Sequence, residues 1–239
     1  MRRVSRPSLS PCQGRRTLTG SLLSARGITK RYGRVLALAP ASIDVEPGDA
    51  LALIGPNGAG KSTLLSILAR ALQPSAGSIE TPAGAVPRVG WVPQRPSHYQ
   101  RLSPRENLEL FARLELVPDA KTVAGRFLAL LDLPDDDRLT AELSAGNQQR
   151  LNLAVALLAQ PDVLLLDEPT ASLDPRQRRL LWEVAAQVRG RGGAVVFATQ
   201  NLEELERFAT RVAVLVGGEL VFDGSLAEFH TAPEADVFA

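Results

Sequence analysis

A glycine-rich segment that ends in Lys-Ser has the clearest chemical character in this sequence. It runs Gly55-Pro56-Asn57-Gly58-Ala59-Gly60-Lys61-Ser62 and is followed by Thr63. Glycines allow successive backbone N–H groups to point inward at phosphate oxygens, and the N-terminus of a following helix adds partial positive charge. In this pattern Lys61 reaches the β- and γ-phosphates, Ser62 offers its hydroxyl to Mg²⁺, and Thr63 supports the loop. The segment therefore predicts a site for ATP and Mg²⁺.

A pair of carboxylates supplies the chemistry that the first segment lacks. Asp167 and Glu168 directly follow the apolar run Val163-Leu164-Leu165-Leu166. In a parallel sheet the end of this strand lies at the same edge as the phosphate loop. Asp167 is then expected to hold Mg²⁺, commonly through water, and Glu168 to activate a water for attack on the γ-phosphate. A strand that merely ends in solvated acids is the alternative, and the phosphate loop upstream argues against it.

The elements that must position these groups alternate buried strands with helices. Continuous apolar runs of strand length cover Ala50–Ile54, Val163–Leu166 and Ala194–Ala198, and helical periodicity covers Lys61–Leu72 and Gln177–Arg189. This alternation predicts an α/β fold with a parallel, doubly wound core around the phosphate loop.

Other segments are expected to flank that core. From Leu22 to Leu53, short alternating apolar runs broken at Tyr32-Gly33 predict antiparallel hairpin strands. Further short strands are expected around Ser78-Ile79 and over Val89–Val92. The mostly helical region that follows predicts a helical insert at about residues 96–158. The sequence thus predicts one domain over residues 22–239, without internal repeats.

Composition restricts the class of protein. Of 239 residues, 45% are hydrophobic and 22% are charged, with a formal net charge of +1, which is the balance of a soluble globular protein. Such neutrality gives no electrostatic case for nucleic acid, and none is expected as a partner. The longest apolar runs, such as Leu151–Ala159, are far shorter than the roughly 20 residues that span a bilayer. The single Cys12 cannot form an internal disulfide, which suits a reducing compartment.

The first 21 residues depart from this charge balance. No Asp or Glu precedes Asp44, whereas five arginines lie in this Ser/Pro/Gly-rich stretch: Arg2, Arg3, Arg6, Arg15 and Arg16. We predict that residues 1–21 form a disordered basic extension. An organellar transit peptide, a basic arm for lipid or nucleic acid, and a start without function all remain open, whereas the lack of an apolar stretch after the arginines argues against a secretory signal.

One further segment carries a family resemblance. Leu143-Ser144-Ala145-Gly146-Asn147-Gln148-Gln149-Arg150 is similar to the signature of ATP-binding-cassette proteins, and the chain resembles their nucleotide-binding domain from about residue 24 to residue 230. The resemblance implies that Ser144 and the Gly146 amide contact the γ-phosphate held by a second cassette, in a homodimer or a heterodimer. It also implies that Tyr32 stacks on adenine and that Gln94 contacts Mg²⁺ and the attacking water.

Two departures from the family pattern are expected to matter. The family usually has a histidine at Gln200, which contacts the γ-phosphate; a glutamine can donate a hydrogen bond there but cannot carry the imidazolium charge. We therefore predict slower hydrolysis with ATP binding retained. In the signature, Ala145 and Asn147 replace residues that are usually glycine and glutamine, which raises the prospect of a different partner cassette.

The resemblance also suggests a kind of transporter. Residues Leu102–Leu108 and Gly217–Ser225 look like those of bacterial exporter-type cassettes, and the chain ends shortly after Phe229, without the C-terminal regulatory domain usual in carbohydrate importers. The implied function is an ATPase that powers export through an integral membrane permease, while the chain itself is cytoplasmic and peripheral on the inner face of the membrane. We expect the permease to dock near Gln94, Trp91 and Tyr99. The alternatives are a soluble or regulatory cassette ATPase and the degenerate half of a heterodimer.

Overall fold

The computed structural model describes residues 20–81, 86–233 and 235. The predicted basic extension lies outside the described residues, apart from Gly20 and Ser21, and so does Cys12. Within the described ranges, no helix has both the length and the apolar character needed to cross a membrane.

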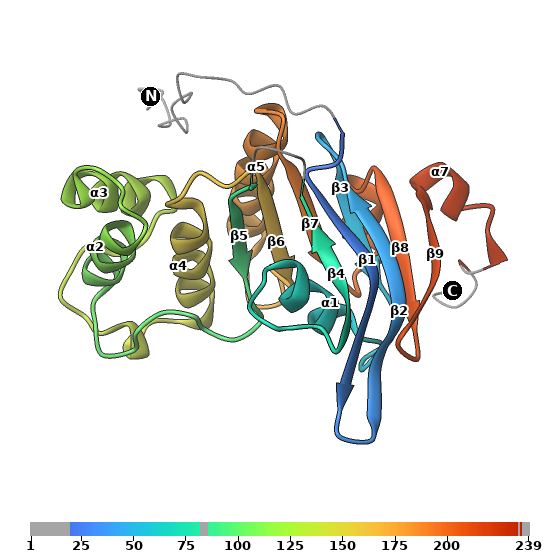
Figure 1. The fold of residues 1–239 in the computed structure, drawn as a ribbon. Helices are drawn as coiled ribbons and strands as arrows, with labels where there is room; N and C mark the ends of the chain where they lie inside the picture. The colour runs from blue at the N-terminus through green and yellow to red at the C-terminus, as the bar shows by residue number, and fades with distance from the viewer. Residues whose placement is uncertain (1–19, 82–85, 234, 236–239) are drawn as a thin grey trace.

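The smaller of two β-sheets is antiparallel. Its strands lie in the order β2-β1-β4 and comprise β1 (Leu23–Tyr32), β2 (Val35–Val45) and β4 (Ala76–Glu80). β1 and β2 form a long hairpin whose two-residue turn contains Gly33 at a φ of 58°, a conformation that favours glycine. The predicted hairpin around Tyr32-Gly33 is therefore confirmed (Figure 1).

The larger sheet carries the ends of the chemically important strands. Its order is β5-β6-β7-β3-β8-β9, with all neighbours parallel except β9, which pairs antiparallel with β8. Every residue of β3, β6 and β7 is buried, as expected for a parallel sheet covered on both faces. The strands are β3 (Ala50–Ile54), β5 (Val89–Val92), β6 (Val163–Asp167), β7 (Ala194–Ala198), β8 (Arg211–Val216) and β9 (Glu219–Ser225).

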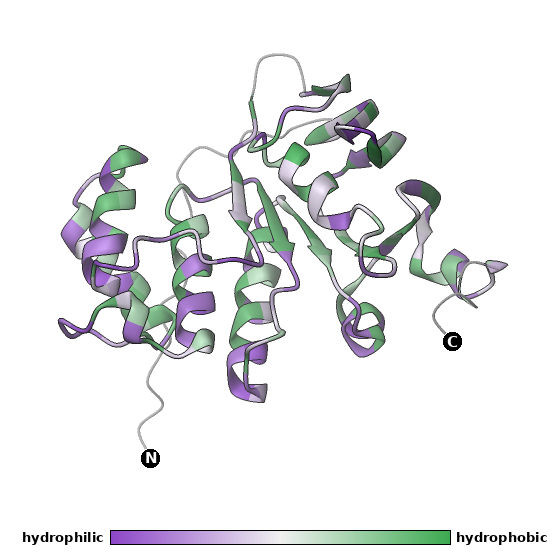
Figure 2. Ribbon diagram, turned by 90° about the horizontal axis from the view of Figure 1, so that it is seen from below, coloured by the Kyte–Doolittle hydropathy of each residue, from purple (hydrophilic) through white to green (hydrophobic). Residues whose placement is uncertain are grey.

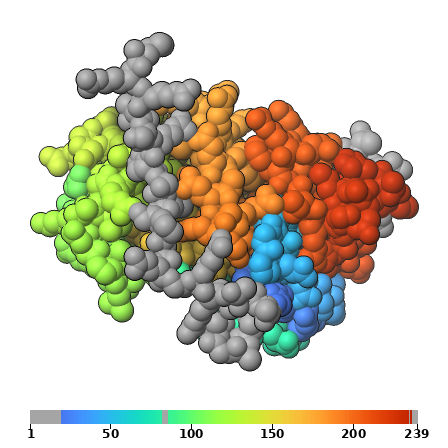
Figure 3. Space-filling model, turned by 90° about the horizontal axis from the view of Figure 1, so that it is seen from above, coloured from blue at the N-terminus to red at the C-terminus, as the bar shows by residue number. Residues whose placement is uncertain are grey.

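Helices cover this sheet and extend to one side of it. The helices α2, α3 and α4 gather at one end of the molecule, and α7 lies at the opposite end (Figures 1 and 3). The first three of these helices, α2, α3 and α4, fall within the predicted insert at about residues 96–158, and the boundaries of the insert stay a prediction. The helices are α1 (Lys61–Leu68), α2 (Pro104–Leu114), α3 (Ala120–Leu130), the 3-10 turn η1 (Thr140–Glu142), α4 (Ala145–Leu157), α5 (Pro175–Gly190), α6 (Leu202–Phe208) and α7 (Leu226–Phe229).

The prediction that the first helix continues to Leu72 is wrong. α1 ends at Leu68, because Arg70 adopts a left-handed φ of 57° and the N–H groups of Ala71 and Leu72 both donate to the carbonyl of Ser66. Apolar residues at helical spacing continue past this point, but Ala69 and Leu72 pack against the core from a turn rather than from a helix. Periodicity alone therefore overestimated the helix by one turn.

Two hydrophobic clusters lie on opposite faces of the larger sheet. Along β3, Leu51 and Leu53 pack in the cluster shared with α1 and the smaller sheet, whereas Ala52 and Ile54 pack in the cluster shared with α4 and α5. This is the two-residue alternation of a strand with both faces buried. The central strands are correspondingly hydrophobic in Figure 2, while the helices show one polar and one apolar side.

The helix α4 is fixed closely to the edge of the sheet. A Cβ atom at Gly90 on β5 would lie 2.4 Å from the carbonyl oxygen of Ala156 on α4. Only glycine allows the two backbones to approach this closely. The last turn of α4 is thus held at a defined position relative to β5.

Candidate nucleotide site

The phosphate loop joins β3 to α1, and its shape requires glycine at two positions. A Cβ atom at Gly55 would lie 2.1 Å from the carbonyl oxygen of Leu215, and one at Gly60 would lie 2.8 Å from that of Ala37. Gly55 and Gly60 also have positive φ values of 152° and 102°. At Gly58 a Cβ would meet no atom within 4 Å, so this part of the loop borders open space. Phosphate oxygens can therefore approach the loop there.

Lys61 is held against its own loop. Its side chain is buried, and Nζ donates to the carbonyl oxygens of Gly55 at 2.6 Å and Pro56 at 3.0 Å. Burial lowers the pKa of Lys61, although the negative charges of Glu168 and Asp167 act in the opposite direction. A phosphate group would give this buried ammonium a stronger anionic partner than two carbonyls do.

Ser62 and Asp167 meet beside the loop. Asp167 ends β6 with its side chain buried, and the nearby hydroxyl of Ser62 favours the charged form of its carboxyl. Burial raises the pKa of the Asp167 carboxyl, and the nearby charge of Glu168 adds to this effect. A hydroxyl and a poorly solvated carboxylate are hard oxygen donors that suit Mg²⁺, which is commonly bound by one or two carboxylates together with substrate phosphates. The residues present therefore fit this ion.

Glu168 lies where three loops converge at the carboxyl ends of the parallel strands. Gln94, which follows β5, donates to Glu168 Oε2 at 3.0 Å, and Gln200, which follows β7, donates to Oε1 at 2.8 Å. Nε2 of Gln200 also lies 2.8 Å from Oδ1 of Asn57 in the phosphate loop. Glu168 itself has a φ of 46°, which costs energy for a residue other than glycine and often occurs at functional sites. The predicted catalytic residues Glu168, Gln94 and Gln200 are thus brought together.

Ser144 and Gly146 face a different neighbour. Ser144 is exposed and caps α4 by accepting a hydrogen bond from the N–H of Asn147 at 3.3 Å. A Cβ at Gly146 would lie 2.7 Å from Oε1 of Gln177 and 3.0 Å from the carbonyl oxygen of Ser172. These contacts are with α4 itself, with α5 and with the segment before α5, rather than with the phosphate loop. Gly146 thus has a packing requirement besides its predicted role.

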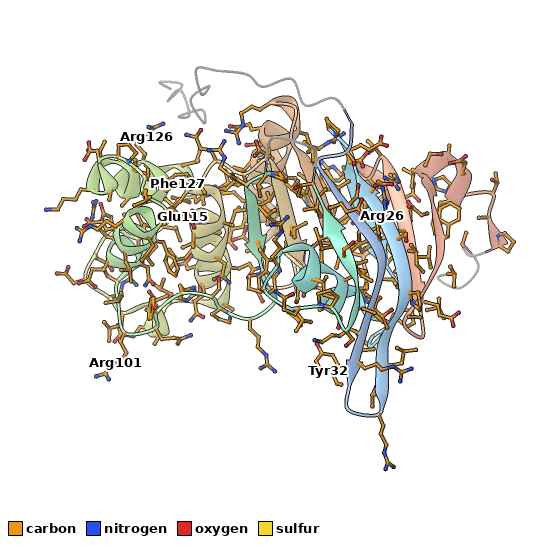
Figure 4. All side chains as sticks on the ribbon, viewed as in Figure 1. Arg26, Tyr32, Arg101, Glu115, Arg126 and Phe127 are labelled. Atoms are coloured by element: carbon orange, nitrogen blue, oxygen red, sulfur yellow. The ribbon has the colours of Figure 1, made fainter. Side chains whose placement is uncertain are left out.

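Tyr32 offers a partly free aromatic ring. It lies near the end of the long hairpin, on the side of the molecule where α1 lies (Figures 1 and 4). The residue is 50% exposed, and Nζ of Lys30 lies 5.4 Å from its ring centroid. A ring with accessible surface can stack on a flat base, as predicted for adenine.

With this geometry in view, comparison with known proteins decides the family. The family model described as "ABC transporter" matches residues 38–171, a span that contains the phosphate loop, Glu168 and Ser144. The chain belongs to the ABC transporter family. It is an ABC ATPase that binds ATP, as the sequence predicted.

Two relatives and one solved structure illustrate the similarity. The daunorubicin resistance ATP-binding protein DrrA3 of Streptomyces coeruleorubidus is 36% identical over 92% of this chain and 73% of the relative. The Nod factor export ATP-binding protein I of Burkholderia thailandensis is 38% identical over 83% of this chain and 69% of the relative. A dimeric bacterial ABC transporter cassette, MJ0796, is 25% identical with a TM-score of 0.76, over 85% of this chain and 98% of that one. The predicted fold class is confirmed.

Within this ABC signature, the unusual Asn147 has an internal partner. Its Oδ1 accepts a hydrogen bond from the guanidinium of Arg150, which also donates to the carbonyl oxygens of Leu131 and Asp132, each at 2.7 Å. Asn147 therefore helps to anchor the start of α4. The structure gives this departure from the family pattern a local role, whereas its effect on partner choice stays a prediction.

Sequence reasoning missed how the loops of the site are tied together. It placed Asn57 in the phosphate loop only as a backbone donor, whereas its side chain contacts Gln200, 143 positions away in the sequence. It also gave no role to Glu204, which hydrogen-bonds Thr170 and Thr199. No local sequence signal marks such long-range hydrogen bonds, because each residue type is common in its own segment.

Proposed function

We propose that this ABC ATPase powers transport across a membrane through a separate membrane-spanning partner, and that the direction is export. The observation that carries the proposal is the carboxylate of Glu168, held between the amides of Gln94 and Gln200 beside the phosphate loop. Such a carboxylate is positioned to accept a proton from a water that attacks the γ-phosphate.

Each residue of the site has a proposed role in that reaction, which converts ATP and water to ADP and phosphate. Backbone N–H groups from Gly55 to Thr63, except at Pro56, which has none, bind the phosphates together with the ammonium of Lys61, while Tyr32 stacks on adenine. Glu168 takes the proton of the attacking water. Gln94 and Gln200 orient Glu168 and donate hydrogen bonds toward the reacting groups.

Mg²⁺ is the proposed metal. Ser62 and Asp167 would hold it, and Gln94 would contact it through its side-chain oxygen. When bound, the ion would reduce the negative charge on the phosphate oxygens. Asp167 supplies a carboxylate whose burial makes a cationic partner favourable.

A second cassette is the first proposed partner. The exposed hydroxyl of Ser144 and the amide of Gly146 at the start of α4 are suited to a phosphate held by that second cassette. The dimeric arrangement of the MJ0796 cassette supports this proposal. Both a homodimer and a heterodimer are compatible with it.

An integral membrane permease is the second proposed partner. The names of two relatives refer to drug resistance and to Nod factor export, which supports an export function at the cytoplasmic face of a membrane. Tyr99, 56% exposed beside the Gln94 loop, offers an apolar contact for the permease. Trp91, which lies on β5, is not proposed for this contact, because its partly buried side chain packs against a core cluster and its Nε1 is buried.

Steady-state ATPase activity of the purified chain with Mg²⁺ tests the proposal. Wild type should hydrolyse ATP, and Glu168→Gln should lose at least about 100-fold in kcat, because it removes the proton acceptor. Glu115→Gln, which removes an exposed carboxylate at the end of α2, should behave as wild type. Equal activity of wild type and Glu168→Gln would overturn the assignment of Glu168.

The glutamine at position 200 supports one alternative, in which this chain is the less active half of a heterodimer. In that case ATP binds, but neither wild type nor Gln200→His hydrolyses it alone. Adding the partner cassette would then restore turnover. Turnover by the isolated chain would exclude this alternative.

A further inference from the structure

Glu204 is a buried carboxylate that contacts two loops of the nucleotide site. It lies on α6 and is 5% exposed. The hydroxyl of Thr170 donates to one carboxylate oxygen, and the hydroxyl of Thr199 donates to the other at 2.9 Å. Burying a carboxylate costs free energy unless its oxygens are hydrogen-bonded, and here both oxygens have a partner.

The two threonines belong to the two loops that carry the proposed catalytic groups. Thr170 lies two residues after Glu168, and Thr199 directly precedes Gln200. The side chains of Glu168 and Gln200 are themselves hydrogen-bonded at 2.8 Å. The two loops are thus joined by the side chains of Glu168 and Gln200, by the N–H of Glu168, which donates to the carbonyl of Ala198 at 3.0 Å, and through Glu204.

The helix that carries Glu204 is firmly held. Asn201 caps α6 by accepting a hydrogen bond from the N–H of Glu203 at 2.9 Å, and Leu205 is fully buried. At the other end, the ring of Phe208 stacks on that of Trp182 with centroids 4.2 Å apart and an interplanar angle of 14°. Since α6 is anchored at both ends, the Glu204 carboxylate is a fixed point for the loops.

Thr199 extends this connection to the backbone. Its hydroxyl oxygen accepts a hydrogen bond from the N–H of Asn201 at 3.0 Å while its proton is donated to Glu204. The backbone on both sides of Gln200 is therefore oriented by the same hydroxyl. A displacement of Glu204 would shift the Gln200 amide relative to Asn57 and Glu168.

We propose that Glu204 is a positioning residue for ATP hydrolysis, which holds the loops of Glu168 and Gln200 at a fixed separation through Thr170 and Thr199. This inference rests on the proposed function, in which Glu168 activates the attacking water. Glu204 acts through the two threonines and contacts no reacting atom.

Kinetics of Glu204→Gln provide the first test. Glutamine keeps the shape but turns one of the two acceptor atoms into a donor. One threonine hydroxyl must then accept where it now donates, and the negative charge that strengthens both hydrogen bonds is lost. We expect kcat to fall by about 10- to 100-fold, since small misplacements of catalytic groups have effects of this size. ATP affinity should change by less than about twofold, because the phosphate loop is untouched. The matched control is Glu203→Gln on the exposed side of the same helix, which should behave as wild type.

The threonines allow a coupling test. Thr170→Val removes one hydroxyl and should lower kcat by itself, but it should add little to the loss already caused by Glu204→Gln, because both changes break the same bridge. Independent, multiplicative losses in the double variant would overturn the proposal. A kcat of Glu204→Gln within about twofold of the wild-type value would also overturn the proposal.

Hydrogen exchange of the nucleotide-free protein tests the bridge without turnover. Thr170→Val should increase exchange in the segment 199–202, and Thr199→Val should increase it in 168–171, because Glu204 links the hydroxyls of the two segments. Effects confined to the mutated segment would contradict the bridge. If wild type and Glu168→Gln showed no difference in turnover, the proposed function would fail, whereas the exchange result would still decide whether Glu204 couples the loops.

Discussion

The two amides around Glu168 hold its carboxylate without adding a charge. Gln94 and Gln200 each donate one hydrogen bond to it, at 3.0 and 2.8 Å. An imidazolium at position 200 would add a positive charge close to the γ-phosphate, which an amide cannot provide. The site is therefore suited to position water but provides less stabilisation of developing negative charge.

Gln200→His is expected to speed hydrolysis by about tenfold, because it restores a group that can carry positive charge. The ratio of its kcat to that of wild type should rise as pH falls through about 6.5, where imidazole becomes protonated. Rate measurements across this range check both points. A ratio that does not change with pH would show that the positive charge of histidine does not cause the difference in rate.

Asp167→Asn is expected to stabilise the nucleotide-free protein while removing Mg²⁺-dependent hydrolysis. Because burial raises the pKa of Asp167 in the folded state, the stability of wild type falls as pH rises through that pKa. The melting temperature of the variant should exceed that of wild type at about pH 7.5, and the difference should shrink toward about pH 4. Thermal unfolding at both values gives the answer, and a variant less stable than wild type at the higher pH would refute it.

At the scale of elements, the phosphate loop is shaped by contacts with strands distant in sequence. Gly55→Ala should destabilise the fold by about 3 kcal/mol, because its Cβ would collide with the carbonyl of Leu215. Gly58→Ala should cost only about 1 kcal/mol of backbone strain, since its Cβ meets open space. Denaturant unfolding of the two variants separates these effects, and equal losses would contradict the close packing at Gly55.

Two helix caps form a second matched pair. Ser144 caps α4 and Ser103 caps α2, so Ser144→Ala and Ser103→Ala should each cost about 1 kcal/mol of stability. Only Ser144→Ala should also weaken ATP-dependent dimerisation, because its hydroxyl is proposed to contact the phosphate held by a second cassette. Sedimentation with ATP distinguishes the two variants. An equal effect of both variants on dimerisation would show that Ser144 acts only as a helix cap.

Local sequence patterns predicted best those strands and helices in which the pattern of apolar residues is strongest. The buried strands β3 and β7 were predicted with their observed bounds, because continuous apolar runs define both ends. The prediction did not assign β9, whose residues alternate between exposed and half-buried, or α6, which has only seven residues. It likewise identified the motif residues of the site but not the hydrogen bonds that join their loops. Those depend on tertiary packing, which periodicity does not encode.

At the scale of the whole molecule, the proposed site consists of two separate parts of the chain. The phosphate loop, Asp167 and Glu168 lie at the carboxyl edge of the larger sheet, whereas Ser144 is exposed at the start of α4 with its contacts elsewhere. Two copies, or this chain and a related cassette, would each supply what the other lacks. Binding of ATP would then favour the closed dimer, and hydrolysis would release it.

The association state of Glu168→Gln with and without ATP and Mg²⁺ tests this account most directly. Sedimentation should show a monomer without nucleotide and a stable dimer with ATP, because binding is retained while the reaction that releases the dimer is blocked. Lys61→Ala should remain monomeric under both conditions, since it loses the phosphate contact. A Glu168→Gln protein that binds ATP and stays monomeric, or that hydrolyses it as fast as wild type, would contradict the account.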